Sequence, residues 1–202
     1  MNIVIFIINF YRPMSYFKFQ HLLAGTGVSA GFYHAIEPVL SRRRYGEQKD
    51  YLDSSIFRKQ VSFVESGLLA CWQEADHGDD VLIDFAIPGD LLFSFSALFG
   101  FRSQAASFLK AIEPTELICL SMPDAKRIWQ EQPDTELVLR HFFHRRQERQ
   151  QAHSRMLLMK PPARFEAFRQ SFPDTWFRLP NRLICAYLRI SETTLLRAKR
   201  RN

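Results

Sequence analysis

The chain of 202 residues is long enough to bury a sizeable core, as one large domain or two modest ones. Hydrophobic residues make up 47% and charged residues 24%, which excludes a fibrous repeat and a wholly disordered chain. The three cysteines, Cys71, Cys119 and Cys185, are odd in number and widely scattered, so neither a disulfide framework nor a C-x-x-C site is predicted. We expect a reducing, cytoplasmic location.

The net charge of +6 is unevenly distributed. Up to Leu139 there are 12 Lys and Arg against 17 Asp and Glu, a net charge of −5, whereas Arg140 to Asn202 has 15 against 4, a net charge of +11. Like charges repel within a folded unit, so this asymmetry favours a polyanionic partner such as nucleic acid for the C-terminal part. A basic face that is merely solvated is the alternative.

Residues 1–15 form an apolar leader, and the first ten of them are almost all hydrophobic. That run is shorter than the roughly 20 residues that span a bilayer, and it lacks the positive start and the cleavage site of a signal peptide. We expect translation to begin at Met14, which would leave most of the leader outside the native protein. Neither secretion nor membrane insertion is predicted.

The segments that follow predict an α+β fold. Residues 16–40 have the apolar spacing of helices, interrupted at Gly25-Thr26-Gly27. Short β-type runs separated by turn residues then predict an antiparallel sandwich or jelly roll. These runs cover residues 61–64, 68–73, 80–87, 107–112 and 116–120.

Helical signals dominate after Pro123. Residues 135–159 contain no proline or glycine and predict one helix of up to about 25 residues, although its polar middle demonstrates no coiled-coil seam. Another helix is expected from Pro161-Pro162 to Phe172. These signals divide the chain into a β-roll over residues 16–125, a long helix within 126–160 and a helical unit over 161–202.

The C-terminal residues predict two short helices, 181–188 and 191–201, packed across a tight turn. Ser191 is a suitable N-cap, Glu192 suits the helix dipole, and Arg189 stands where glycine is common, which costs about 1 kcal/mol if its φ is positive. The pair resembles a helix-turn-helix that reads a DNA major groove, and an ordinary amphipathic helix is the alternative. The candidate DNA-binding residues are Arg182, Ser191, Glu192, Thr193, Thr194, Arg197, Lys199, Arg200 and Arg201.

Five motifs in a fixed order resemble those of a known family. They are residues 63–69 (FVESGLL), 85–90 (FAIPGD), 111–113 with 116–117 (AIE and EL), 132–134 (QPD) and 183–191 (LICAYLRIS). Over residues 20–202 the chain resembles the Crp/Fnr family of bacterial transcription regulators. This resemblance implies a cyclic-nucleotide-binding-like β-roll, a long dimerisation helix within 126–160, and a homodimer that binds double-stranded DNA with Arg197 as a base-reading residue.

The effector segment departs from the family pattern. Members that bind cyclic AMP hold the ribose with a glutamate and the phosphate with an Arg-Ser pair, whereas Phe95 and Ala105-Ala106 stand at the corresponding positions here. A buried phosphate without a countercharge costs several kcal/mol, so no cyclic-nucleotide response is predicted unless Arg102-Ser103 comes into register. The aromatic residues of this region indicate either a pocket for a small apolar effector or a filled core. They are Phe85, Phe93, Phe95, Phe99 and Phe108.

Other kinds of chemistry find little support in the sequence. No cysteine precedes Cys71, so an N-terminal iron–sulfur cluster is not predicted, and no cofactor is expected. His141 and His144 share one helix face but lack a third metal ligand. No catalytic set is identifiable, so an enzyme is not predicted. The main rival to a DNA-binding regulator is a sensor or scaffold whose basic C-terminal region binds a protein or a membrane surface.

Overall fold

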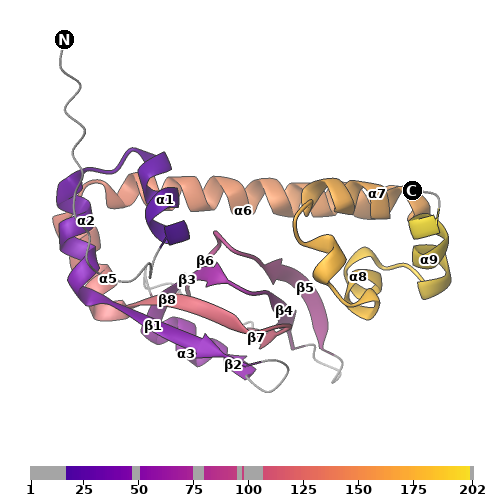
Figure 1. Ribbon diagram of the computed structural model, residues 1–202, viewed down its shortest axis with the longest axis horizontal. Helices are drawn as coiled ribbons and strands as arrows, with labels where there is room; N and C mark the ends of the chain where they lie inside the picture. The colour runs from indigo at the N-terminus through magenta and orange to yellow at the C-terminus, as the bar shows by residue number, and fades with distance from the viewer. Residues whose placement is uncertain (1–16, 47–50, 75–79, 95–96, 98–106, 201–202) are drawn as a thin grey trace, which may run out of the picture.

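The computed structural model describes residues 17–46, 51–74, 80–94, 97 and 107–200. A β-roll lies beneath one long helix, and a small helical unit continues from the far end of that helix (Figure 1). The predicted α+β class is therefore confirmed. Among the described residues, no helix has the length and apolar character needed to cross a bilayer.

The N-terminal segment forms two helices where the sequence predicted an interrupted helical stretch. Helix α1 covers Phe17–Thr26, α2 covers Ala30–Ile36, and the 3-10 helix η1 covers Glu37–Val39. The break lies at Gly27, whose φ of 80° suits a residue without a Cβ. Ser29 then caps α2 by accepting a hydrogen bond from the backbone N–H of Phe32.

The β-roll consists of two four-stranded antiparallel sheets, with strand orders β1-β8-β3-β6 and β2-β7-β4-β5. All five predicted strands are present, whereas β1, β2, β6 and the short helix α3 were not predicted. The bounds are Leu40–Tyr45 (β1), Tyr51–Asp53 (β2), Ser54–Lys59 (α3), Gln60–Ser66 (β3), Leu69–Gln73 (β4), Val81–Ala86 (β5), Leu91–Leu92 (β6), Ser107–Ala111 (β7) and Thr115–Ser121 (β8).

Small and aliphatic side chains fill the space between the two sheets. Alternation along the strands places one set of residues in this interior and the intervening set on the outer faces. The buried interior residues are Leu52, Val64, Leu69, Ala86, Leu109, Ala111, Leu117 and Cys119.

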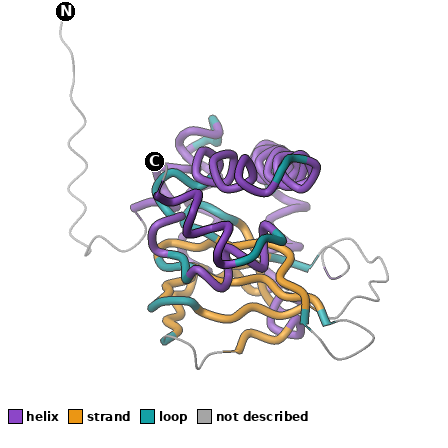
Figure 2. The backbone as a smooth tube through the Cα atoms, turned by 90° about the vertical axis from the view of Figure 1, so that its right-hand side faces the viewer, coloured by secondary structure: helices purple, strands orange, loops and turns teal. Residues whose placement is uncertain are grey.

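The C-terminal half of the chain is helical, as predicted, and in Figure 2 helices gather on one side of the strands. The long helix α6 has 24 residues, Thr135–Leu158, in close agreement with its predicted bounds. Asp134 precedes it, but its carboxylate accepts the backbone N–H of Ser29 at 2.7 Å and so ties α6 to α2. The other elements are α5 (Met122–Glu131), α7 (Pro161–Ser171), η2 (Trp176–Arg178), α8 (Asn181–Leu188) and α9 (Glu192–Arg200).

Candidate nucleic-acid interface

Helices α8 and α9 are joined by a tight turn whose geometry agrees with the sequence. Arg189 adopts a left-handed conformation with φ 51° and ψ 52°, so the condition under which a non-glycine residue is costly at this turn position is met. The hydroxyl of Ser191 accepts the backbone N–H of Thr194 at 3.2 Å, which confirms the predicted N-cap of α9. Arg164 of α7 stabilises the turn, because its Nη1 donates hydrogen bonds to the carbonyl oxygens of Leu188 and Arg189 at 2.9 and 3.1 Å.

One face of helix α9 is buried and the opposite face is exposed to solvent. Leu195 and Ala198 are buried against α7 and α8, and they fix which side of the helix meets solvent. The opposite side presents a mixture of a hydroxyl, an acid and cations, which is the kind of surface that reads base edges and phosphates. The exposed predicted residues are Ser191, Glu192, Thr193, Arg197 and Arg200 at and along α9, and Arg182 on α8.

Three further predicted residues are placed differently. Lys199 is only partly exposed, since its Nζ donates to Oδ1 of Asn181 at 2.6 Å and lies 5.8 Å from the centre of the Trp176 ring. Thr194 is also partly exposed, and its hydroxyl lies 2.9 Å from that of Ser191. Arg201 lies outside the described residues. Lys199 thus joins α9 to α8, whereas Thr194 takes part in the cap at the start of α9.

Leu196 was missed by the sequence reasoning. Its side chain is 41% exposed on α9, between Thr193 and Arg197 on the solvent side of the helix. Exposure to water does not stabilise a leucine side chain, but an apolar side chain in a major groove can contact the methyl group of thymine. The available signal was its position in the helix, one turn from Thr193 and away from the buried stripe.

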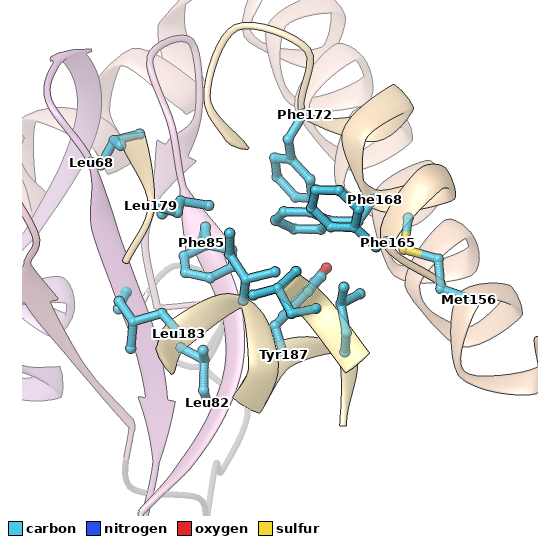
Figure 3. Packing of buried hydrophobic residues seen from close by; sticks show 14 of the residues in the cluster. Leu68, Leu82, Phe85, Met156, Phe165, Phe168, Phe172, Leu179, Leu183 and Tyr187 are labelled. Carbon is cyan, nitrogen blue, oxygen red and sulfur yellow. The ribbon is translucent and has the colours of Figure 1, made fainter. Parts of the chain in front are cut away.

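The helix pair is fixed to the β-roll by a shared hydrophobic core (Figure 3). Phe85 of β5 is fully buried, and its ring centre lies 5.1 Å from that of Tyr187 in α8. The ring centres of Phe168 and Phe172 lie 6.3 and 6.1 Å from that of Phe85. His153 of α6 stacks on Tyr187 at 3.9 Å, and its Nε2 lies 2.9 Å from the Tyr187 carbonyl oxygen. The orientation of α8 and α9 is therefore set by the roll.

A largely buried ion cluster, in which Asp90 is buried and Arg149 and Asp84 keep some exposure, joins α6 to the roll. Arg149 lies between two carboxylates, with Nη1 2.7 Å from Oδ2 of Asp90 and Nε 3.3 Å from Oδ2 of Asp84. Burial raises the pKa of Asp84, and the nearby Arg149 partly offsets that rise. One turn earlier, Arg145 donates from Nη1 to the carbonyl oxygen of Gly89 at 3.1 Å. These two arginines account for how a helix with a polar middle packs on the roll.

Neither a family model nor a curated protein matches this chain. Solved structures do match it. FixK2 from Bradyrhizobium japonicum is 17% identical, with 81% of this chain and 84% of that chain covered and a TM-score of 0.65. CLP, a c-di-GMP-responsive global regulator from Xanthomonas campestris, is 16% identical, with 86% and 91% covered and a TM-score of 0.62. A protein described as a Crp/Fnr-family transcriptional regulator from Eubacterium rectale is 14% identical, with 87% and 84% covered and a TM-score of 0.61.

The chain has the fold of the Crp/Fnr regulators. The resemblance inferred from sequence motifs is thereby confirmed at the level of the fold. More than four-fifths of this chain is covered in each comparison.

Within this Crp/Fnr fold the predicted effector aromatics do not come together in one pocket among the described residues. Phe85 packs against the helix-turn-helix, Phe93 lies 5.8 Å from Phe143 of α6, and Phe108 stacks on Trp72 at 6.4 Å. Phe95 and Phe99 lie outside the described residues, as do Arg102-Ser103 and Ala105-Ala106. The cyclic-nucleotide prediction therefore remains a prediction.

Of the two histidines His141 and His144 on α6, His144 pairs with an acidic residue of the same helix. Nδ1 of His144 lies 3.3 Å from Oε2 of Glu148 one turn later. Among the described residues, no group of three or more His, Cys, Asp or Glu side chains is arranged to hold a metal ion. The three cysteines, which all fall in the described part of the chain, have free thiols.

Proposed function

We propose that this chain is a DNA-binding transcription regulator rather than an enzyme, and that it acts in the reducing cytoplasm without a bound cofactor. The observation that carries the proposal is the solvent side of α9. It presents Thr193, Leu196, Arg197 and Arg200 on a helix whose other side is buried in a Crp/Fnr-type fold. The excess of positive charge after Leu139 supports a polyanionic partner.

The exposed residues divide into two kinds of contact. Arg197 can donate two hydrogen bonds to the edge of a guanine, and Leu196 beside it can contact a thymine methyl group. Arg182 of α8 and Arg200 at the end of α9 are exposed, and we expect them to meet phosphates and to add affinity that does not depend on sequence. Ser191 contributes mainly by capping α9, because its hydroxyl is engaged by Thr194.

A homodimer is part of the proposal. Along the second half of α6, exposed residues recur at alternating intervals of four and three, which places them on one face of the helix. They are Gln147, Gln151, Ser154 and Leu158. Leu158 ends this row and is 88% exposed. Two copies paired here would present their α9 helices to half-sites about 34 Å apart on a near-palindromic operator.

The regulator is proposed to bind DNA without a cyclic nucleotide. Two observations support this part of the proposal. Phe95 and Ala105-Ala106 stand where cyclic-AMP-binding members have the residues that hold the ribose and the phosphate. The ring of Tyr187 in α8 already packs on Phe85 of the roll. Isothermal titration with cyclic AMP should give no binding heat. Binding at micromolar concentration would refute this part of the proposal and leave the DNA-binding part intact.

The decisive experiment selects genomic fragments with the purified protein at physiological salt and no added ligand. A palindromic motif is the expected product. Arg197→Ala should then weaken operator binding by about 1–3 kcal/mol and relax base choice, whereas Arg200→Ala should weaken all sequences alike. Arg155→Ala is the matched control, because Arg155 is an exposed arginine of α6 rather than of the helix-turn-helix.

Recovery of random fragments would contradict the proposal as stated. That outcome would leave electrostatic affinity only, and it would favour the scaffold whose basic region binds an acidic protein or a membrane surface. Unchanged operator binding by Arg197→Ala would show that α9 is not the reading helix.

A further inference from the structure

Two adjoining hollows lie between α1 and α6, away from the helix-turn-helix. One has a volume of about 390 Å³ and the other about 510 Å³, and Gly25, His141 and Arg145 line both. Figure 1 shows α1 against the first half of α6, while α8 and α9 lie toward its other end. Each volume falls in the range of sites that take small metabolites.

The lining of these hollows is strongly basic. The residues that carry or can carry positive charge are Lys18, His21, Arg140, His141, His144 and Arg145. Among the described lining residues, Glu148 is the one acid, and it already pairs with His144. A concave surface lined by one sign of charge focuses its field on a counter-ion.

Both walls are held in place by other contacts. The buried carboxylate of Glu65 accepts the backbone N–H groups of Lys18 and Phe19 at 2.9 and 3.0 Å, which anchors the start of α1 on the roll. Arg145 is anchored by the Gly89 carbonyl, and that bond uses one of the five N–H donors of its guanidinium. The cations therefore face a preformed space.

The space between these walls has cationic neighbours and is open. Burial is the main cause that lowers the pKa of His141, and the nearby charges of Arg145 and His144 lower it further. A Cβ added at Gly25, which lines both hollows, would meet no atom within 4 Å, so the region beside α1 is open.

We infer that this basic groove binds a small anion with two or more negative charges carried by phosphate or carboxylate groups. The site is separate from the roll interior, which Val64, Leu69 and Leu117 help to fill, and from the DNA-binding face. Arg140 is 18 residues before the end of α6, or roughly 27 Å along the helix axis, so one compact ligand cannot contact both ends.

The test is isothermal titration of the full chain with inorganic pyrophosphate and, separately, with citrate, both at matched ionic strength. Binding of one anion per chain is expected. Lys18→Gln and the pair Arg140→Gln with His141→Gln should each weaken it at least tenfold. Heat with pyrophosphate alone would identify phosphate as the recognised group, heat with citrate alone would identify carboxylate, and heat with both would indicate that charge is sufficient.

Two controls separate this inference from the proposed function. Arg155→Gln removes an exposed cation from the same helix outside the groove and should leave anion binding unchanged. Arg197→Ala should lose operator DNA but retain the anion, and Lys18→Gln should do the reverse. The inference is overturned if neither probe binds at millimolar concentration, if Arg155→Gln weakens binding as much as Lys18→Gln, or if Lys18→Gln loses DNA affinity instead.

Discussion

The two outer faces of the β-roll are covered in different ways. The sheet containing β3 and β8 is covered by α1, α2, α5 and α6, and this cover leaves an apolar cavity of about 80 Å³ beside Phe63. The β4–β5 side of the other sheet is covered by α7 and α8, and aromatic rings from both sides fill the contact. The helices next to the candidate DNA-binding face are thus part of the roll's own core.

This difference has a consequence for how the protein works. A helical unit joined to the roll by a flexible linker would be free to rotate, but here removal of that unit would expose Leu82 and Phe85 to water. The orientation of α9 is therefore coupled to the stability of the roll. Substitutions on the two outer faces of the roll should show whether the stability of the roll depends on the contact with α7 and α8 more than on the cover of the other sheet.

The largest effect is expected at the centre of the shared core. Phe85→Ala should lower the free energy of unfolding by about 3–5 kcal/mol, because it leaves a cavity between Tyr187 and Phe168. Phe177→Ala is the matched control, since Phe177 is 63% exposed and should change stability by less than about 0.5 kcal/mol. Urea denaturation followed by fluorescence measures both. Equal effects would show that the helix pair does not pack on the roll.

A smaller loss is expected when the ion cluster is broken. Arg149→Met leaves Asp84 and Asp90 without their shared countercharge and should cost about 3 kcal/mol at pH 7. The pKa of Asp84 is already raised in the folded state, so its ionisation destabilises the fold as the pH rises through that pKa. Removal of Arg149 raises the pKa further.

The cost of Arg149→Met should therefore shrink between pH 7 and pH 4, as the carboxyl of Asp84 takes up its proton. Arg155→Met, at an exposed position of the same helix, should be close to neutral at every pH. Denaturation midpoints measured across this range provide the check, and a cost for Arg149→Met that does not vary with pH would disprove the role given to Asp84.

One substitution made on both faces compares their packing directly. Ala70→Val adds volume to the aromatic contact around Trp72 and Phe85 and should destabilise by about 1–3 kcal/mol, although valine favours a strand. Ala125→Val points the same added volume at the cavity beneath α5 and should stabilise by about 0.5–1 kcal/mol, although valine disfavours a helix. Thermal unfolding at one pH is sufficient. The same sign in both variants would show that the two covers are packed alike.

Sequence patterns located the C-terminal elements well because their signals are local. The run without proline or glycine predicted α6, and Arg189 and Ser191 marked the turn between α8 and α9. Strand β1 was missed because Arg42-Arg43-Arg44 hides the alternation, and its cations are partly compensated by Glu116 on the neighbouring strand.

The partners of individual side chains were harder to predict. The sequence indicated either an effector pocket or a filled core for Phe85, and its ring packs against residues about 100 positions later in the chain. Arg149 was one of many polar residues in α6, and its two carboxylate partners lie in or just after β5. Such pairings depend on the topology that brings distant segments together, and neither helical periodicity nor composition contains that information.

The smallest expected effect tests whether the two regions unfold together. Arg189→Gly removes a side chain from a left-handed residue and should stabilise the turn by about 0.5–1 kcal/mol. If the roll and the helix-turn-helix share one core, this gain raises a single unfolding midpoint measured by any probe.

Ala186→Gly is the control for that substitution, since Ala186 lies in the last turn of α8 and glycine there should destabilise by about 1 kcal/mol. Fluorescence is recorded in a Trp176→Phe background, so that Trp72 in the roll and Trp129 in α5 are the reporters. Fluorescence and far-ultraviolet circular dichroism should then shift together in both variants. A shift in the circular dichroism alone would mean that α8 and α9 unfold independently, and the coupling between the orientation of α9 and the stability of the roll would then fail.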